Sequence, residues 1–230
     1  MPLLKPNESR IQNSLALIIV ILVLDILGLI IGFLNFSQVQ SAISQNFNYK
    51  EDVNIFELFD LLIAIIRFFA MVASTVLFIL WFRRAYFNLH LLVPNLEHKE
   101  GWAAGGWFVP ILSLFIPYQI MRDLFNHSLR LLNLKGNTTY EYVDTKIVGG
   151  WWALYLVSGF MQRISTRYSL RAETNDEYLA SIVFELISIV ISIVLALVVI
   201  KLIKTYERIE KDLHSEYSKI DELTEVPNLN

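Results

Sequence analysis

The stretch RRAYFNLHLLVPNLEHKEGWAAGGWFVPILSLFIPYQIM, residues 83–121, decides which fold the sequence predicts. It lies between long apolar runs, yet it contains charged residues, a glycine cluster and two of the five tryptophans. Residues 102–121 alone are long enough to cross a bilayer, but Pro110 and Pro117 interrupt them. Whether this stretch crosses a membrane therefore determines the topology of the whole chain.

Composition is typical of a membrane protein. Of the 230 residues, 55% are apolar and 18% are charged, and the mean hydropathy is +0.49. The formal charge of −3 and the scattered basic residues argue against a nucleic-acid partner. The chain has no cysteine, which excludes disulfides, thiolate metal sites and a cysteine nucleophile.

Four apolar runs have the length that a helix needs to cross a hydrocarbon core of about 30 Å. They are residues 13–34, 55–82, 147–164 and 178–200. The intervening parts are an N-terminal segment (1–12), a segment that we call the linking module (83–146), and a C-terminal tail (201–230). The tail is expected to begin as a helix and to end in disorder.

The distribution of Lys and Arg decides between four and five spans, because cytoplasmic loops carry the excess of positive charge. With four spans and a cytoplasmic N-terminus, fourteen of these residues lie inside and four lie outside. With 102–121 as a fifth span, eight lie inside and ten outside. All five tryptophans also fall near the inner interface in the four-span arrangement, where indole rings prefer to lie. The sequence therefore predicts four spans, with both termini cytoplasmic.

The linking module is expected to remain at the inner face. Residues 117–135 have an apolar face at helical spacing, with Pro117 in the first turn and Gly136 just past the end. This pattern predicts an amphipathic helix that lies on the membrane. It leaves open whether 102–121 enters the bilayer as a re-entrant segment or lies flat upon it.

Apolar residues of the tail recur near heptad spacing, at Leu202, Tyr206, Ile209, Leu213 and Ile220. The pattern covers under three heptads, which is too short to indicate a coiled coil. Two alternatives remain open. The helix either continues from the fourth span and packs on the linking module, or it dimerises.

Two ionisable residues, Asp25 and Arg67, lie near the middle of the first and second spans. Such residues are costly in a membrane and usually face a partner, so we expect Asp25 to pair with Arg67. Asp60 is a second acceptor nearer the outer surface. Gly28 and Gly32 share the face of Asp25 and allow close helix approach. The pair either fixes helix register or belongs to a proton or ion pathway.

Polar side chains also form a stripe on each of the last two spans. The fourth span carries Ser181, Glu185, Ser188 and Ser192, and the third carries Tyr155, Ser158, Gly159 and Gln162. Interhelical hydrogen bonds are the favoured interpretation. Glu185 is charged, and Arg163 is one cation within reach of it. Alternatively, Arg163, Arg167 and Arg171 bind lipid phosphates, and a solvated basic face is the default interpretation of these three residues. A small transporter or channel component that uses Asp25, Arg67 and Glu185 is the alternative function.

No motif for catalysis or cofactor binding is present. The sequence lacks a metalloprotease helix, a phosphate-binding glycine loop, a nucleophile elbow and paired histidines at ligand spacing. We therefore expect no enzyme activity, no cofactor and no metal.

Four short segments carry a resemblance to a known family. They are WFRRAYFNL (81–89), GW (101–102), WFVPI (107–111) and PYQIM (117–121). Together they resemble the bacterial multi-pass membrane family catalogued as domain of unknown function 4328. The match departs from the family pattern at Ser113, Ile116 and Phe125. The resemblance implies a location in the bacterial inner or plasma membrane and a four-span fold, but no activity.

The expected fold is an all-α membrane protein with four transmembrane helices in two hairpins, separated by a proline-broken interfacial or re-entrant module. The expected function is structural, sensing, or binding of a partner or lipid through that module. Membrane lipids and a protein partner or second copy are the expected partners. The residues expected to act there are Arg83, Arg84, Tyr86, Asn88, Trp102, Trp107, Pro110, Pro117 and Tyr118.

Among these residues, Arg83 and Arg84 suit an anionic lipid or a carboxylate. Asn88, Trp107 and Tyr118 suit polar-tipped anchors. The same residues also fit an ordinary belt of positive charge and aromatic rings at the inner interface.

Overall fold

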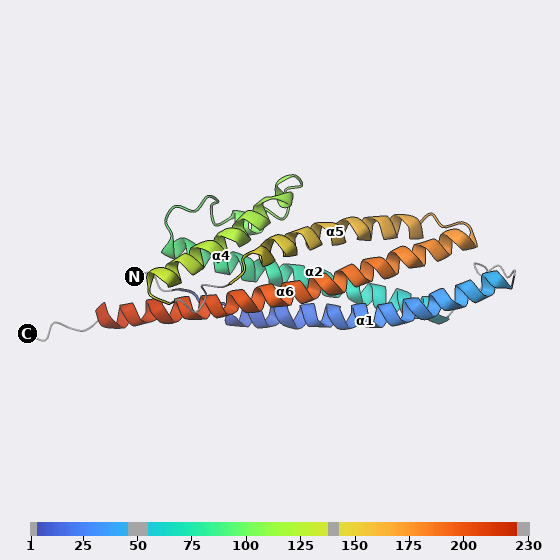
Figure 1. Ribbon diagram of the computed structural model, residues 1–230, viewed down its shortest axis with the longest axis horizontal. Coiled ribbons are helices and arrows are strands. Elements are labelled where there is room, and N and C mark those ends of the chain that lie inside the picture. Colours follow the sequence, from blue (N-terminus) through green and yellow to red (C-terminus); the bar gives the residue numbers. More distant parts are fainter. Residues whose placement is uncertain (1–3, 46–54, 138–142, 225–230) are drawn as a thin grey trace, which may run out of the picture. The chain divides into compact units, whose positions relative to one another are not determined.

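The computed structural model describes residues 4–45, 55–137 and 143–224, which form helices and turns without any strand (Figure 1). The elements are α1 (Glu8–Ser44), α2 (Ile55–Leu92), α3 (Trp102–Gly105), the 3-10 turn η2 (Leu112–Leu114), α4 (Ile116–Leu134), α5 (Lys146–Ser169) and α6 (Asn175–Thr224). The predicted all-α fold is confirmed within these residues.

The long helices extend beyond the apolar runs that predicted them. α2 continues past residue 82 to Leu92, so the start of the linking module is helical. α6 has 50 residues and joins the fourth apolar run to the tail without a break. Once a helix has formed, each further residue adds a hydrogen bond without a new nucleus, so a polar stretch can simply prolong it.

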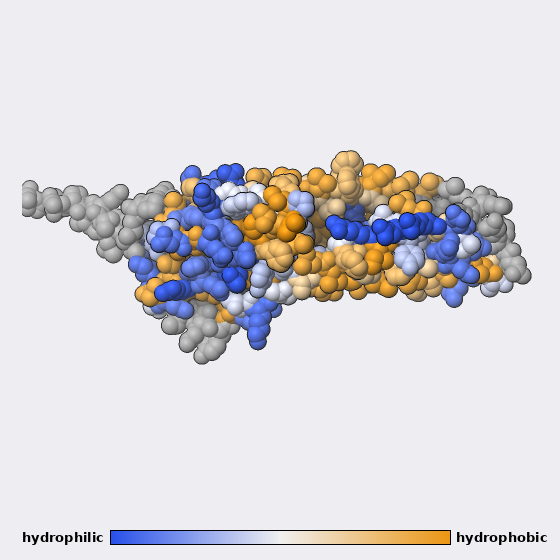
Figure 2. Space-filling model, turned by 90° about the horizontal axis from the view of Figure 1, so that it is seen from above, coloured by the Kyte–Doolittle hydropathy of each residue, from blue (hydrophilic) through white to orange (hydrophobic). Residues whose placement is uncertain are grey.

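Three of the described helices are long and apolar enough to cross a membrane: Glu8–Ser44, Leu61–Leu92 and Asn175–Lys219. α5, with 24 residues, is not among them. Large apolar side chains are exposed on all three, for example Phe33 at 63%, Phe69 at 67% and Leu197 at 53%. Figure 2 shows apolar residues gathered over a large part of the surface. Such a surface suits lipid rather than water.

The chain packs as two compact units, and each long helix contributes to both. Unit 1 contains Met1–Leu15, Thr75–Gly150 and Ile200–Asn230, and unit 2 contains Ala16–Ser74 and Trp151–Val199. Unit 2 therefore holds the later parts of α1 and α5 and the earlier parts of α2 and α6. Unit 1 holds the linking module together with the N-terminal and C-terminal segments.

In unit 2, small residues of α1 accept side chains of the neighbouring helices. A Cβ atom at Gly28 would lie 3.7 Å from Ile189 and 4.0 Å from Ile63. A Cβ atom at Gly32 would lie 3.0 Å from Leu186. The glycine face predicted beside Asp25 therefore does allow close approach.

In unit 1, α4 is the predicted amphipathic helix, and its bounds agree with the prediction to within one residue at each end. Gly136 has a φ of +80°, and its N–H donates to the Asn133 carbonyl at 3.0 Å. The Asn137 N–H donates to the Leu132 carbonyl at 3.0 Å. These two bonds form a Schellman cap, which favours glycine because it enters the left-handed region without strain.

The apolar face of α4 contacts protein, so the expectation that this face lies on the membrane is wrong. Its fully buried residues are Ile120, Met121, Leu124, Phe125 and Leu132. Phe125 packs against Tyr206 of α6, with ring centroids 5.5 Å apart. Periodicity identifies a face that avoids water without identifying what covers it.

The tail part of α6 also packs within unit 1. Leu202 and Ile209 are fully buried, and Tyr206 packs edge-on against Trp81 with ring centroids 6.1 Å apart. Of the two alternatives for the tail, the structure shows packing on the linking module. The side chain of Ile220 lies outside the described residues.

Residues 107–115 form a loop whose two ends are held together. A Cβ atom at Gly106 would lie 2.7 Å from Ile116 Cγ2 and 2.8 Å from the Trp102 carbonyl oxygen. Both distances are too short for any real contact, so only glycine fits at this position.

We predict that Gly106→Ala destabilises the protein by about 1–3 kcal/mol, the usual cost of overpacking. The Trp102 carbonyl belongs to the backbone and cannot move away cheaply. Gly105→Ala is the matched control, because a Cβ atom there would meet Trp102 Cε3 at an ordinary 3.9 Å. Thermal unfolding in detergent measures both variants, and equal melting temperatures would contradict the close packing at Gly106.

Candidate functional site

Asn88, on the later part of α2, is buried in unit 1 and holds the backbone of the N-terminal segment. The Lys5 N–H donates to Asn88 Oδ1 at 3.0 Å, and Asn88 Nδ2 donates to the Lys5 carbonyl at 2.8 Å. A side-chain amide offers a donor and an acceptor, as a peptide group does. The Asn88 side chain therefore pairs with the backbone of Lys5 through two hydrogen bonds, as the backbone of an adjacent β-strand would.

Glu210 completes a group that we call the Asn88 cluster: Lys5, Asn7, Asn88 and Glu210. Asn7 Nδ2 donates to both Glu210 carboxylate oxygens, at 3.2 and 3.1 Å, and Asn88 Nδ2 donates to Oε1 at 3.1 Å. Glu210 is only 5% exposed. Amide donors replace the water that this carboxylate lost on burial. The cluster joins the N-terminal segment, α2 and the tail part of α6.

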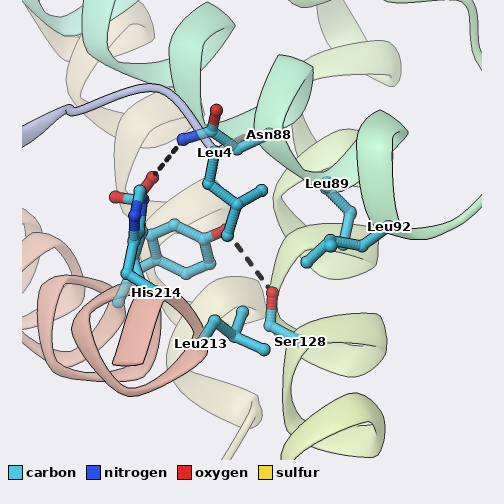
Figure 3. Close-up of a pocket in the computed structure, with 9 residues that line it drawn as sticks. Leu4, Asn88, Leu89, Leu92, Ser128, Leu213 and His214 are labelled. Atoms are coloured by element: carbon cyan, nitrogen blue, oxygen red, sulfur yellow. Dashed lines mark hydrogen bonds between the residues drawn. The ribbon is translucent and has the colours of Figure 1, made fainter. Parts of the chain in front are cut away.

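A small hollow adjoins the Asn88 cluster (Figure 3). Its lining residues are Leu4, Asn88, Leu89, Leu92, Ser128, Tyr206, Glu210, Leu213 and His214. The hydroxyls of Ser128 and Tyr206 lie 3.5 Å apart across it. The hollow has room for about one water molecule, so it does not accommodate a small organic ligand. Within the described ranges, no three His, Cys, Asp or Glu side chains are grouped to hold a metal ion.

The electrostatics of the Asn88 cluster are dominated by burial. Glu210 lies in the charged part of α6, beyond the apolar run 178–200. Burial raises its pKa to about 7, although the hydrogen bonds from Asn7 and Asn88 act in the opposite direction. Burial also raises the pKa of the Tyr206 hydroxyl, and the nearby Glu210 raises it further. Glu210 therefore changes its protonation near neutral pH.

The aromatic motif residues hold the linking module on α2. Trp107 packs edge-on against Phe78 and Phe82, with centroids 5.8 and 6.1 Å apart. Tyr86 is fully buried and donates from its hydroxyl to the His98 carbonyl at 2.9 Å. Burial raises the pKa of Tyr86 to about 12. Both aromatic residues therefore stabilise the path of the chain after α2.

The basic motif residues are more exposed. Arg83 Nε lies 3.5 Å from Glu100 Oε1, and this exposed pair adds little stability. The Arg84 guanidinium lies 6.0 Å from the Phe87 ring. Of the two predicted partners, Arg83 contacts a carboxylate, and that carboxylate belongs to its own chain.

The remaining motif residues surround the loop 107–115. Trp102 opens α3, and Pro110 is exposed within the loop. Pro117 is buried in the first turn of α4, as predicted. Tyr118 lies one residue further, and the Arg122 guanidinium lies 6.0 Å from its ring.

The predicted pair of Asp25 and Arg67 is present in unit 2. Arg67 Nε lies 2.6 Å from Asp25 Oδ1, and Ser192 Oγ donates to Asp25 Oδ2 at 2.6 Å. The Asp25 side chain is fully buried. Each oxygen of this carboxylate therefore has a partner. The side chain of Asp60, the expected second acceptor, lies outside the described residues.

The polar stripes on α5 and α6 make interhelical contacts. Ser188 Oγ donates to Gln162 Oε1 at 3.2 Å, which links the two helices as expected. Glu185 is exposed on unit 2, and the charge of Arg67 acts on it. Arg67 therefore influences two carboxyl groups within unit 2.

Sequence reasoning missed Asn7 and Glu210. Asn7 stands in a polar segment ahead of the first apolar run, and Glu210 stands among the alternating charges of the tail. One signal was available, because Tyr206, Glu210 and Leu213 follow at i, i+4 and i+7 and so share the buried face. A carboxylate on that face needs donors, but no spacing rule indicates that residue 7 supplies them.

The family model described as a domain of unknown function (DUF4328) matches residues 45–208. The chain belongs to the DUF4328 family. This confirms the resemblance carried by the motifs between residues 81 and 121. No curated protein and no solved structure shows a significant match. Lys5 and Asn7 precede the matched residues and Glu210 follows them, so Asn88 of the DUF4328 domain binds both flanking segments.

We predict that Glu210 lowers the stability of the folded protein as the pH rises from 5 to 8. Its folded pKa of about 7 lies above the ordinary value of 4.5, so the folded state holds the proton more tightly. The stabilising contribution is fully present below pH 4.5 and is lost as the pH rises through 7. One pKa unit corresponds to about 1.4 kcal/mol, so the loss over this range is on the order of 2 kcal/mol.

Glu210→Gln removes the pH-dependent contribution of Glu210 to stability, because an amide does not titrate. Melting temperatures measured from pH 5 to 8 in one detergent give the comparison. Glu216→Gln is the control, because Glu216 is a partly exposed glutamate on the same helix that pairs with Lys219. Parallel curves for the unmodified protein and Glu210→Gln would show that Glu210 keeps an ordinary pKa.

We also predict that Asp25→Asn and Arg67→Gln each destabilise the protein by about 3–5 kcal/mol, because each leaves a charge in the protein without its partner. Since the two side chains are in contact, the double variant should lose less than the sum of the two single losses. Thermal melting of the four proteins gives the coupling energy. Strictly additive losses would rule out a direct ion pair.

Proposed function

We propose that this DUF4328 protein is a four-span protein of the bacterial inner or plasma membrane, with both termini in the cytoplasm. Its linking module lies at the inner face and binds a partner rather than catalysing a reaction. The partner is an extended peptide segment, and the chain's own residues 4–7 occupy the binding site.

Helix lengths and charge distribution support the four-span arrangement. Three helices have the length and apolarity to cross a membrane, and the 24 residues of α5 supply a further crossing between α4 and α6. Fourteen Lys and Arg residues then lie inside and four outside. The irregular stretch between α2 and α4 is anchored to α2 by Trp107, which packs on Phe78 and Phe82.

The observation that carries the binding function is the pair of hydrogen bonds between Asn88 and the backbone of Lys5. Main-chain recognition of this kind accepts an extended segment whatever side chain stands at that position, as in strand addition to a sheet edge. Lys5 precedes Pro6, which disfavours the helical conformation at Lys5 and keeps the segment extended.

Side chains on either side of Lys5 give the site its specificity. Leu4 lines the hollow together with Leu89 and Leu213. Asn7 reaches the Glu210 carboxylate with its amide. The segment that fits therefore has an apolar residue, two intervening residues and an asparagine.

Two features favour binding over catalysis. The hollow has room for about one water molecule, which leaves no space for a substrate beside Glu210. The donors that surround the Glu210 carboxylate are amides, and amides are neither nucleophiles nor bases at neutral pH. A buried hydrogen-bonded carboxylate of this kind holds segments together.

Transport through the spans is the weaker candidate. It needs Asp25, Arg67 and Glu185 to serve a moving ion or proton. Asp25 is fully buried and bound by Arg67 and Ser192, an arrangement that suits a fixed helix register.

The test removes residues 1–7 and returns the segment as a fluorescent peptide of residues 1–12. We expect the truncated protein in nanodiscs to bind this peptide saturably. The full-length protein should bind it far more weakly, because its tethered segment competes at high effective concentration. In the truncated protein, Asn88→Ala should abolish binding by removing both hydrogen bonds to Lys5. Fluorescence anisotropy measures all three.

Asn133→Ala is the matched control, because Asn133 is an exposed asparagine on α4. It should leave peptide binding unchanged. A truncated protein that melts cooperatively yet does not bind the peptide would refute the proposed function. Equal binding with and without Asn88→Ala would refute the role of Asn88.

A further inference from the structure

A loop of unit 1 exposes large apolar side chains. Phe108 is 76% exposed, Ile111 is 73% exposed and Phe115 is 57% exposed. All three lie in the loop 107–115, between α3 and α4. Exposed apolar residues gathered in one loop indicate contact with another apolar surface rather than with water.

This loop is held in one conformation. Gly106 and Ile116 close its base, at a separation that leaves no room for a Cβ atom. Inside the loop, the Ser113 hydroxyl donates to the Pro110 carbonyl at 2.8 Å, and the Ser113 N–H donates to the Val109 carbonyl at 2.7 Å. A preorganised loop loses little conformational entropy when its apolar residues are buried by a partner.

Trp107 determines where this loop lies along α2. Its indole packs on Phe78 and Phe82. On the same stretch of α2, Val76 is 51% exposed and Leu80 is 41% exposed. The loop therefore begins beside a part of α2 that itself presents apolar side chains outward.

Three arginines mark where this apolar stretch ends. Arg83 and Arg84 follow Phe82 directly. Arg10 donates to the Leu80 carbonyl at 2.8 Å and lies close enough to both arginines for their charges to act on it. A cluster of this kind is complementary to anionic lipid headgroups. The base of the loop packs, through Trp107, on the α2 residues that precede Arg83 and Arg84.

We propose that residues 107–115 form a wedge that inserts Phe108, Ile111 and Phe115 into the inner leaflet of the bilayer. The wedge rests on the proposed topology in one respect, because α2 must cross the membrane with Arg83 at its inner end. It is independent of peptide binding at Asn88. Lipid is favoured over a protein partner because the exposed α2 face beside Trp107 meets acyl chains in this topology.

The absence of cysteine from the chain allows a direct test, because each introduced cysteine carries a single fluorophore. Labels at Phe108→Cys and Ile111→Cys, in nanodiscs of brominated phospholipid, should lose as much emission as a label at Val76→Cys. Iodide in the buffer should leave them unquenched. Leu134→Cys is the matched control, since Leu134 is apolar and 74% exposed at the end of α4, where iodide should quench its label.

Iodide quenching at positions 108 and 111 equal to that at position 134 would overturn the wedge. Protection from both quenchers would also overturn it, because a protein surface would then cover the loop. A Val76→Cys label that bromolipid fails to quench would show that the topology itself is wrong. A lipid-exposed label at position 76 with water-exposed labels at 108 and 111 would refute the wedge alone.

Discussion

Unit 1 depends on the carboxylate of Glu210, which is buried and, among the described residues, has hydrogen-bond donors around it in place of a positively charged partner. An ionised carboxylate costs several kcal/mol to bury unless hydrogen bonds replace its water. For Glu210, the amides of Asn7 and Asn88 supply these bonds. One amide comes from the N-terminal segment and the other from α2, so the carboxylate is satisfied only when three distant segments meet. This polar requirement selects one arrangement from the many that apolar packing alone would tolerate.

Helices and a short-range cap could be predicted from the sequence, whereas this meeting of segments could not. Helical periodicity and the glycine at position 136 located α4 to within one residue, because both signals are local. The contact between Asp25 and Arg67 was predictable because a membrane leaves a charged side chain few partners at its own depth. No comparable restriction limits the possible partners of Asn7, Asn88 and Glu210, so their contact could not be predicted. The ends of the long helices were also predicted in the wrong places. The length of an apolar run reflects the thickness of the bilayer, whereas a helix continues as long as its backbone hydrogen bonds do.

The linking module shows how the same pattern can have two physical causes. An amphipathic helix has a face that avoids water, and a protein core satisfies that face as well as lipid does. In α4 the core does so, since Phe125 packs against Tyr206. The loop 107–115 has no helical periodicity, yet its apolar side chains are the ones left exposed. The exposure of these side chains could not be predicted from their spacing in the sequence. Only the three-dimensional structure shows it.

The loop and the proposed peptide site are connected through one stretch of α2. Trp107 packs on Phe78 and Phe82, and Asn88 follows at about 9 Å further along the helix axis. Sharp bends in helices arise at proline, glycine or π-bulges, and residues 78–92 contain neither proline nor glycine and are α-helical throughout. This stretch is therefore one continuous α-helix between the contacts of Trp107 and Asn88. If the proposed wedge shifts with the bilayer, α2 transmits the shift to Asn88 unless the contacts of Trp107 break. The contacts of Trp107 are apolar ring contacts, whereas Asn88 makes three directional hydrogen bonds, to Lys5 and Glu210, whose geometry tolerates less displacement.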